Sequence, residues 1–137
     1  MSNALYDFGR EGFLDGSIDW DTNNIKLVLL DNADYTVNLT THDNLDDVAA
    51  GARATNGTSS NLASKTKTAG VADAADVLLT AVTGDPSESI VIYADSGVES
   101  SSRLICYIDT ATGLPVTPNG GNITVQFDNG ANRIFKL

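Results

Sequence analysis

Any Ser-His-Asp hydrolase chemistry in this sequence would have to use His42, because it is the only histidine among 137 residues. In such a triad the imidazole takes the proton from the serine hydroxyl. No serine stands in the G-x-S-x-G pattern that exposes a serine nucleophile on a sharp strand-to-helix turn. The alternative for His42 is a loop residue beside a capping aspartate. We therefore expect the chain to be a non-enzyme.

The segment DWDTNN places the oxygen ligands Asp19, Asp21 and Asn23 at alternate positions, a spacing that suggests calcium. An EF-hand loop that starts at Asp19 needs glycine at its sixth position and glutamate at its twelfth. The chain has Asn24 and Leu30 there. The segment is thus interpreted as a polar turn, with an irregular calcium site as the alternative.

A second acidic group, Asp43, Asp46 and Asp47, allows the same two interpretations. Carboxylates in the first turn of a helix complement its dipole, and this explanation needs no ion. A glycosidase needs two carboxylates across the scissile bond, but with 18 acidic residues some pair will lie close by chance. We expect no metal and no cofactor.

The single cysteine, Cys106, lies within the apolar run LICYI, which indicates a small core residue. A reactive thiol would need a basic neighbourhood, and only Arg103 is near in sequence. One cysteine also allows no disulfide within the chain.

The composition argues against nucleic-acid and membrane partners. The net charge is -10, with 15 Asp and 3 Glu against 8 scattered Lys and Arg, so no basic face is visible. No apolar stretch approaches the ~18 residues of a membrane span. The start MSNALYDFGREGFLDG lacks the pattern of a secretory signal, so we expect the protein to stay where it is made or to leave by cell lysis. The preference for Asp over Glu favours turns over helices.

The length predicts a single domain over residues 1–137, with a short helix first and a β-rich body over residues 25–137. The helix is expected at about 3–14, capped by Asn3 and stopped by Asp15-Gly16. Two glycines inside it, at positions 9 and 12, would let its backbone lie close to a sheet.

Eight short apolar or alternating runs separated by turn residues predict an antiparallel β-sandwich, jelly roll or barrel. The predicted strands are IKLVLLD (25–31), YTVNL (35–39), SKTKTAGV (64–71), DVLLTAV (76–82), SIVIYAD (89–95), RLICYID (103–109), ITVQF (123–127) and RIFKL (133–137).

Two of the connections between the predicted strands have distinctive sequences. Residues 41–61 are predicted to be a long polar loop, with a helical turn near residues 43–50. The dipeptide Asn129-Gly130 predicts a tight hairpin between the last two strands. In that arrangement the last strand is built into the fold, with Ile134, Phe135 and Leu137 as core or interface residues.

Along nearly its whole length the chain resembles a family of small virion-associated proteins of tailed bacteriophages and prophages. The resemblance rests on three stretches: NALYDFGREGFLDGSIDW, IKLVLLDNADYTVNL and VTGDPSESIVIYADSGVESSSRLICYIDTATGLPVTPNGGNITVQFDNGANRIFKL. The third stretch is the most specific, particularly its segment GLPVTP at 113–118 and the closing Asn129-Gly130 hairpin.

The resemblance implies a capsid decoration (cement) protein, made in the host bacterial cytoplasm and bound to the outer capsid surface. Such a protein stabilises the shell by bridging major capsid subunits, and its open β edges favour a dimer or trimer. Because loops on rigid β scaffolds commonly carry binding, we expect contacts from the loops and the indole. The candidate contact residues are Trp20, Arg53, Asn56, Leu114, Pro115 and Pro118. The alternative is a tail or tail-fibre component that acts in tail assembly or attaches to host-surface glycans.

Overall fold

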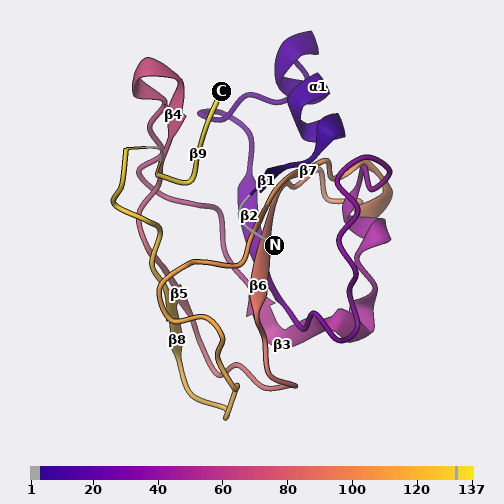
Figure 1. Ribbon diagram of the computed structural model, residues 1–137, viewed down its shortest axis with the longest axis vertical. Helices are drawn as coiled ribbons and strands as arrows, with labels where there is room; N and C mark the ends of the chain where they lie inside the picture. Colours follow the sequence, from indigo (N-terminus) through magenta and orange to yellow (C-terminus); the bar gives the residue numbers. More distant parts are fainter. Residues whose placement is uncertain (1–3, 132) are drawn as a thin grey trace.

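The computed structural model describes residues 4–131 and 133–137. Within them the chain forms one α-helix, four short 3-10 helices and nine strands (Figure 1). In chain order these are β1 (Ala4–Leu5), α1 (Asp7–Asp15), β2 (Ile25–Leu30), η1 (Leu45–Asp47), η2 (Ala50–Ala52), β3 (Arg53–Thr58), η3 (Thr68–Gly70), β4 (Val71–Ala72), β5 (Val77–Leu79), β6 (Ser89–Ala94), η4 (Glu99–Ser101), β7 (Leu104–Ile108), β8 (Ile123–Val125) and β9 (Phe135–Lys136). No helix in the described ranges has the length and apolar character that crossing a membrane requires.

The centre of the fold is a five-stranded antiparallel sheet in the order β1-β7-β6-β2-β3. The three inner strands, β7, β6 and β2, are buried almost throughout. Both faces of these strands are covered, which is why their sequences are nearly continuous apolar runs. The predicted strands at 25–31, 89–95 and 103–109 are confirmed.

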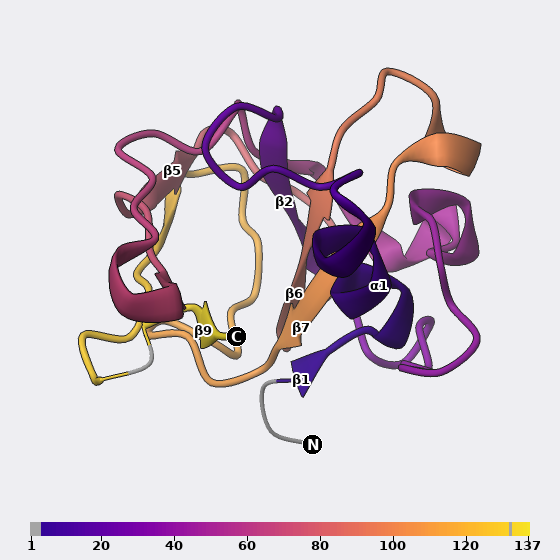
Figure 2. The same cartoon turned by 90° about the horizontal axis from the view of Figure 1, so that it is seen from above.

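Two small antiparallel sheets, β4-β9 and β5-β8, cover one face of the central sheet (Figure 2). The main hydrophobic core lies between these layers and includes Leu27, Ile92, Leu79, Val125 and Phe135. The mainly β, antiparallel class is confirmed, and the described strands form no closed barrel.

The opposite face of the central sheet is covered by the segment 35–52, which forms a second core. At its centre the hydroxyls of Tyr6 and Tyr35 lie 2.8 Å apart, and the Tyr35 hydroxyl is also 2.8 Å from Nδ1 of His42. A chain of hydrogen bonds therefore links the sheet to this cover layer.

The helix begins later than the sequence predicts. Residues Ala4–Leu5 pair with β7 as β1, so α1 starts at Asp7, and the expected cap at Asn3 lies outside the described residues. Gly16 ends the helix in the left-handed conformation, as predicted. Gly9 packs against the backbone of β7, so the expected close approach of helix and sheet is also confirmed.

Two predicted segments have a different structure. YTVNL (35–39) keeps its alternating burial but is not a strand: Tyr35, Val37 and Leu39 pack on the face of the central sheet as part of the second core and pair with no strand edge among the described residues. The predicted loop 41–61 contains two 3-10 turns and then β3, an edge strand of the central sheet. SKTKTAGV (64–71) contributes only its last residue to a strand, β4.

The predicted hairpin at Asn129-Gly130 is wrong. Strand β8 pairs with β5 and β9 pairs with β4, so the last two strands have other partners. Neither residue has a positive φ, and the Gly130 N–H donates to the side chain of Asp128 in a local turn. Ile134 and Phe135 are core residues as expected, whereas Leu137 is 60% exposed.

Candidate functional site

Three uncharged stretches of the sequence, residues 54–64, 77–84 and 110–127, meet in the folded protein. They form β5, β8, β3 from Ala54 onward, and the loops around these strands; β5 and β8 lie at the lower left of Figure 1, and β3 lies at the bottom, to their right. We call the exposed part of these residues the neutral face. On a chain with 26 charged residues and a net charge of -10, an uncharged surface is a distinguishing feature.

Backbone hydrogen bonds fix the three segments to one another. The Thr55 and Thr83 peptide groups exchange two bonds of 2.8 and 3.1 Å, and the side-chain amide of Asn56 adds a bond to the Ala81 carbonyl at 3.0 Å. The segments 77–84 and 110–127 are joined in turn by the Gly120 N–H, which donates to the Val82 carbonyl at 2.7 Å. The neutral face is therefore a fixed surface.

A slot opens in the middle of the neutral face, between β3 and β5. The segments on either side pair at both ends of the slot, through Thr55↔Thr83 and Thr66↔Asp73. Between these points the chain after Thr58 turns away to bond β2, which leaves a pocket of about 400 Å³. Leu78 lines this pocket and is 58% exposed. An exposed leucine beside an uncharged slot is suited to protein contact.

The predicted contact loop 113–118 belongs to the same face. The Leu114–Pro115 peptide bond is cis, and Val116 exchanges two backbone bonds with Ser87. Leu114 packs partly on the core, Pro118 is buried, and Pro115 is exposed. Of these three predicted contact residues, Pro115 offers the most surface to a partner.

Trp20 lies outside the neutral face, and Arg53 directly precedes that face as the first residue of β3. Trp20 is 5% exposed, with its ring edge-on to Phe135 at 5.4 Å and its indole N–H 3.3 Å from the Asp73 carbonyl. The guanidinium of Arg53 donates to carbonyls of the η1 turn and pairs with Glu99. Both side chains are thus engaged within the fold, which counts against them as contact residues. Asn56 is exposed and lies on the neutral face, with its backbone at φ 61°.

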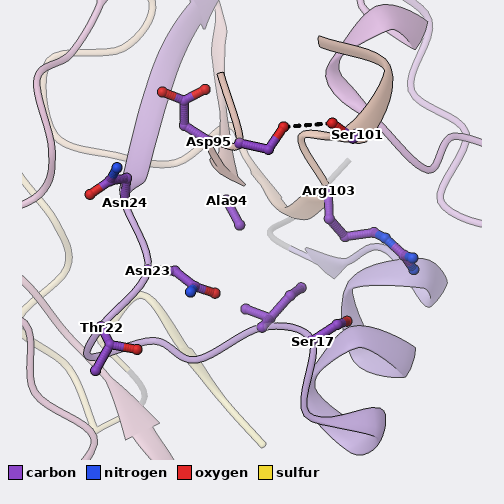
Figure 3. Close-up of a pocket in the computed structure, with 10 residues that line it drawn as sticks. Ser17, Thr22, Asn23, Asn24, Ala94, Asp95, Ser101 and Arg103 are labelled. Atoms are coloured by element: carbon purple, nitrogen blue, oxygen red, sulfur yellow. Dashed lines mark hydrogen bonds between the residues drawn. The ribbon is translucent and has the colours of Figure 1, made fainter. Parts of the chain in front are cut away.

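A polar pocket of about 370 Å³ lies between α1 and the ends of β2 and β6 (Figure 3). Its walls offer the Ser17 hydroxyl, the Asn23 and Asn24 amides, and the Asp95 carboxylate. Lys26, 2.8 Å from Asp95, holds the pKa of that carboxyl below its usual value. Asp95 is therefore an ionised acceptor, and the pocket is suited to binding polar groups.

The side chains in the remaining wall of this pocket form hydrogen bonds within the fold. Arg103 turns toward α1 and donates to the Phe8 carbonyl at 3.0 Å. The dashed line in Figure 3 joins the hydroxyls of Ser96 and Ser101, which lie 2.6 Å apart. A serine nucleophile needs a general base to take its proton, and His42, the only histidine, bonds to Tyr35 in the other core.

Both predicted acidic groups form local turns, and the structure also brings the carboxylate oxygens of Asp43, Asp46 and Asp47 within 4.8 Å of one another, so that this group could hold a divalent cation. Asp19 accepts from the Asp21 and Thr22 N–H groups, and the Thr22 hydrogen bond lowers the pKa of Asp19. The Asp43 N–H donates to the Asp47 carboxylate. Oxygens that could bind a divalent cation also gather at a place the sequence did not indicate. Within the described residues these are the carboxylates of Asp31, Asp34 and Asp85, whose oxygens lie within 4.8 Å of one another.

Cys106 is buried in β7, and burial raises the pKa of its thiol. The prediction of a small core residue is therefore confirmed. Sequence reasoning missed residues 77–84 as part of a surface site, although the absence of charge in three separate runs was visible. No protein-family model matches this chain, and a search of the curated proteins found no match.

Proposed function

We propose that this chain is a non-enzymatic structural protein of a bacteriophage virion, a decoration protein that binds the outer capsid surface and stabilises the shell. The observation that carries the proposal is the neutral face. The cores of protein–protein interfaces are depleted of charged residues, whereas the rest of this surface is strongly acidic.

The charge distribution supports an external position on the particle. A surface with a net charge of -10 repels packaged DNA and favours solubility. The neutral face would then contact the major capsid protein while the acidic remainder faces solvent. Contacts repeated over many copies add up, so that weak individual binding can stabilise a shell by mass action.

We further infer that the central sheet and the two small sheets form an antiparallel β-sandwich of jelly-roll-like character. The support is the main hydrophobic core, which lies between these layers. Such a scaffold holds loops in fixed positions, as a contact surface requires.

The test adds purified protein to capsids that lack it and measures bound protein by co-sedimentation. Leu78→Asp places a charge on the neutral face, and Val98→Asp is the matched control, because both side chains are 58% exposed and Val98 lies outside the neutral face. We expect Leu78→Asp to weaken binding roughly tenfold or more, since burying an unpaired charge is costly. We expect Val98→Asp to leave binding unchanged.

Equal binding by both variants would contradict a contact through the neutral face. A protein that binds no capsid, and that antibody labelling places on no part of the particle, would contradict the virion role as a whole.

The polar pocket of Figure 3 favours a second candidate, a tail or tail-fibre component that binds host-surface glycans. Hydroxyl, amide and carboxylate groups are suited to hydrogen bonding with sugar hydroxyls. Antibody label confined to the tail, together with host-glycan binding that Asn23→Ala abolishes, would replace the decoration proposal with this one.

A further inference from the structure

A third pocket, of about 360 Å³, lies between the strand edges of β1 and β9. Strand β1 pairs only with β7, and β9 pairs only with β4, among the described strands. Both Figure 1 and Figure 2 place β9 close to β1. The two sheets therefore present open edges to the same space.

Backbone polar groups point into this space. Residues of an antiparallel pair alternate between bonding their partner and facing away from it. The Tyr6 N–H bonds to Ile105 on β7, so the peptide groups of its neighbour Leu5 face away from β7. The Leu137 N–H bonds to Gly70, so the peptide groups of Lys136 likewise face away from β4.

The pocket has an apolar floor and a cationic rim. Leu5, Ile134 and Phe135, each at most 8% exposed, line its floor. Its rim carries three of the chain's eight cationic residues and one carboxylate, as follows: Arg10, Arg133, Lys136 and Asp128. A cationic rim on a chain of net charge -10 is complementary to an acidic ligand.

Two of these cations already have partners in the chain. Arg10 pairs with Asp7 at 2.9 Å, and Arg133 lies 3.8 Å from Asp73. Lys136 is exposed and has no ion pair among the described residues. It is thus the cation of the rim that is most available to a ligand.

We propose that this pocket binds an extended, acidic peptide segment of another protein as an added β-strand. The segment would bond the open edges of β1 and β9, place apolar side chains on the floor, and direct carboxylates to the rim. Strand addition gives affinity through backbone bonds and specificity through alternate side chains. The proposal does not depend on the capsid role.

A second copy of the chain is a poorer occupant of the pocket. None of the nine described strands contains Asp or Glu. The acidic residues lie in α1, in turns and in loops, so a second copy offers no acidic strand. An exposed sheet edge is also a known site at which a strand from a different chain is added.

The test titrates the full protein with a capped eight-residue peptide of alternating valine and glutamate, observed by amide NMR and calorimetry. We expect saturable binding, with shifted and exchange-protected amides at Leu5 and Lys136. A peptide with lysine in place of glutamate should not bind, and raising NaCl should weaken the glutamate peptide.

Lys136→Glu should weaken binding of the glutamate peptide roughly tenfold, because it replaces an attractive rim charge with a repulsive one. The control is Lys67→Glu, at an exposed lysine that does not line the pocket and that, unlike Lys136, pairs with Asp21. Equal affinity for the two peptides, or equal effects of the two variants, would overturn the proposal. So would sedimentation showing that the free protein self-associates in a manner that Lys136→Glu abolishes.

Discussion

Replacing Gly9 with alanine should destabilise this protein, although the same change stabilises an isolated helix by about 1 kcal/mol. Gly9 lies in α1 where the helix contacts β7. A Cβ atom at this position would lie 2.7 Å from the Leu104 carbonyl oxygen and 2.8 Å from that of Ile105. These distances are shorter than the non-bonded contacts that Cβ atoms make in folded proteins, so something must shift.

The atoms that a Cβ at Gly9 would meet belong to the backbone of β7, and this determines how much stability the substitution costs. Strand β7 lies inside the central sheet, paired with β1 and β6, so its carbonyls cannot move without breaking the sheet. The helix must shift instead, and overpacking of this kind costs about 1–3 kcal/mol. For a chain of this length, that loss lowers Tm by roughly 4–10 °C.

Urea and thermal unfolding followed by circular dichroism would measure the change. Gly51→Ala is the control, because a Cβ atom there meets nothing within 4 Å and the residue lies in the short η2 turn. We expect the control to stay within about 0.5 kcal/mol of the parent protein. A Gly9→Ala protein as stable as the parent, or more stable, would refute the packing of α1 on β7.

Three further predictions concern the core. Phe135→Ala should cost about 3–5 kcal/mol in urea unfolding, whereas Leu137→Ala, at a side chain that is 60% exposed, should change little; similar losses would contradict the structural role of β9. Burial raises the pKa of Tyr35 and of Tyr93 to about 12, so the folded state keeps these protons after the unfolded state releases them near pH 10. Stability should therefore be complete below about pH 10 and fall between pH 10 and 12, and a flat urea midpoint over that range would contradict the burial. Cys106 should react with a thiol reagent only at the rate of unfolding, and fast labelling of folded protein would contradict its burial.

The sequence predicts the inner strands well because their signal is local. Strands β2, β6 and β7 are apolar on both faces, and a short apolar run between turn residues is typical of a doubly covered strand. The segment 35–39 shows the limit of that signal. Its alternation reports burial of Tyr35 against the second core, and burial does not require a strand partner.

Strand pairing was harder to predict because it depends on the whole fold. The dipeptide Asn129-Gly130 favours a hairpin locally, yet β8 and β9 join different sheets. The neutral face was missed for the same reason, because it too depends on how distant segments pair. Each of its three runs is uncharged in the sequence, and pairings across the fold bring them together. Thr55↔Thr83 joins residues 54–64 to 77–84, and the pairing of β5 with β8 joins residues 77–84 to 110–127.

The neutral face and the pocket between β1 and β9 are suited to partners of opposite character, and the salt dependence of binding distinguishes the two surfaces. Binding through an uncharged surface depends mainly on buried apolar area, which salt does not screen. Binding at the rim of Lys136 depends on exposed charges, which are largely screened beyond about 8 Å at physiological ionic strength. Capsid binding that persists in high salt, with loss of peptide binding, would assign the two interactions to separate surfaces. Capsid binding that falls with salt in parallel with peptide binding, and that Lys136→Glu weakens more than Leu78→Asp, would instead assign both to the pocket between β1 and β9.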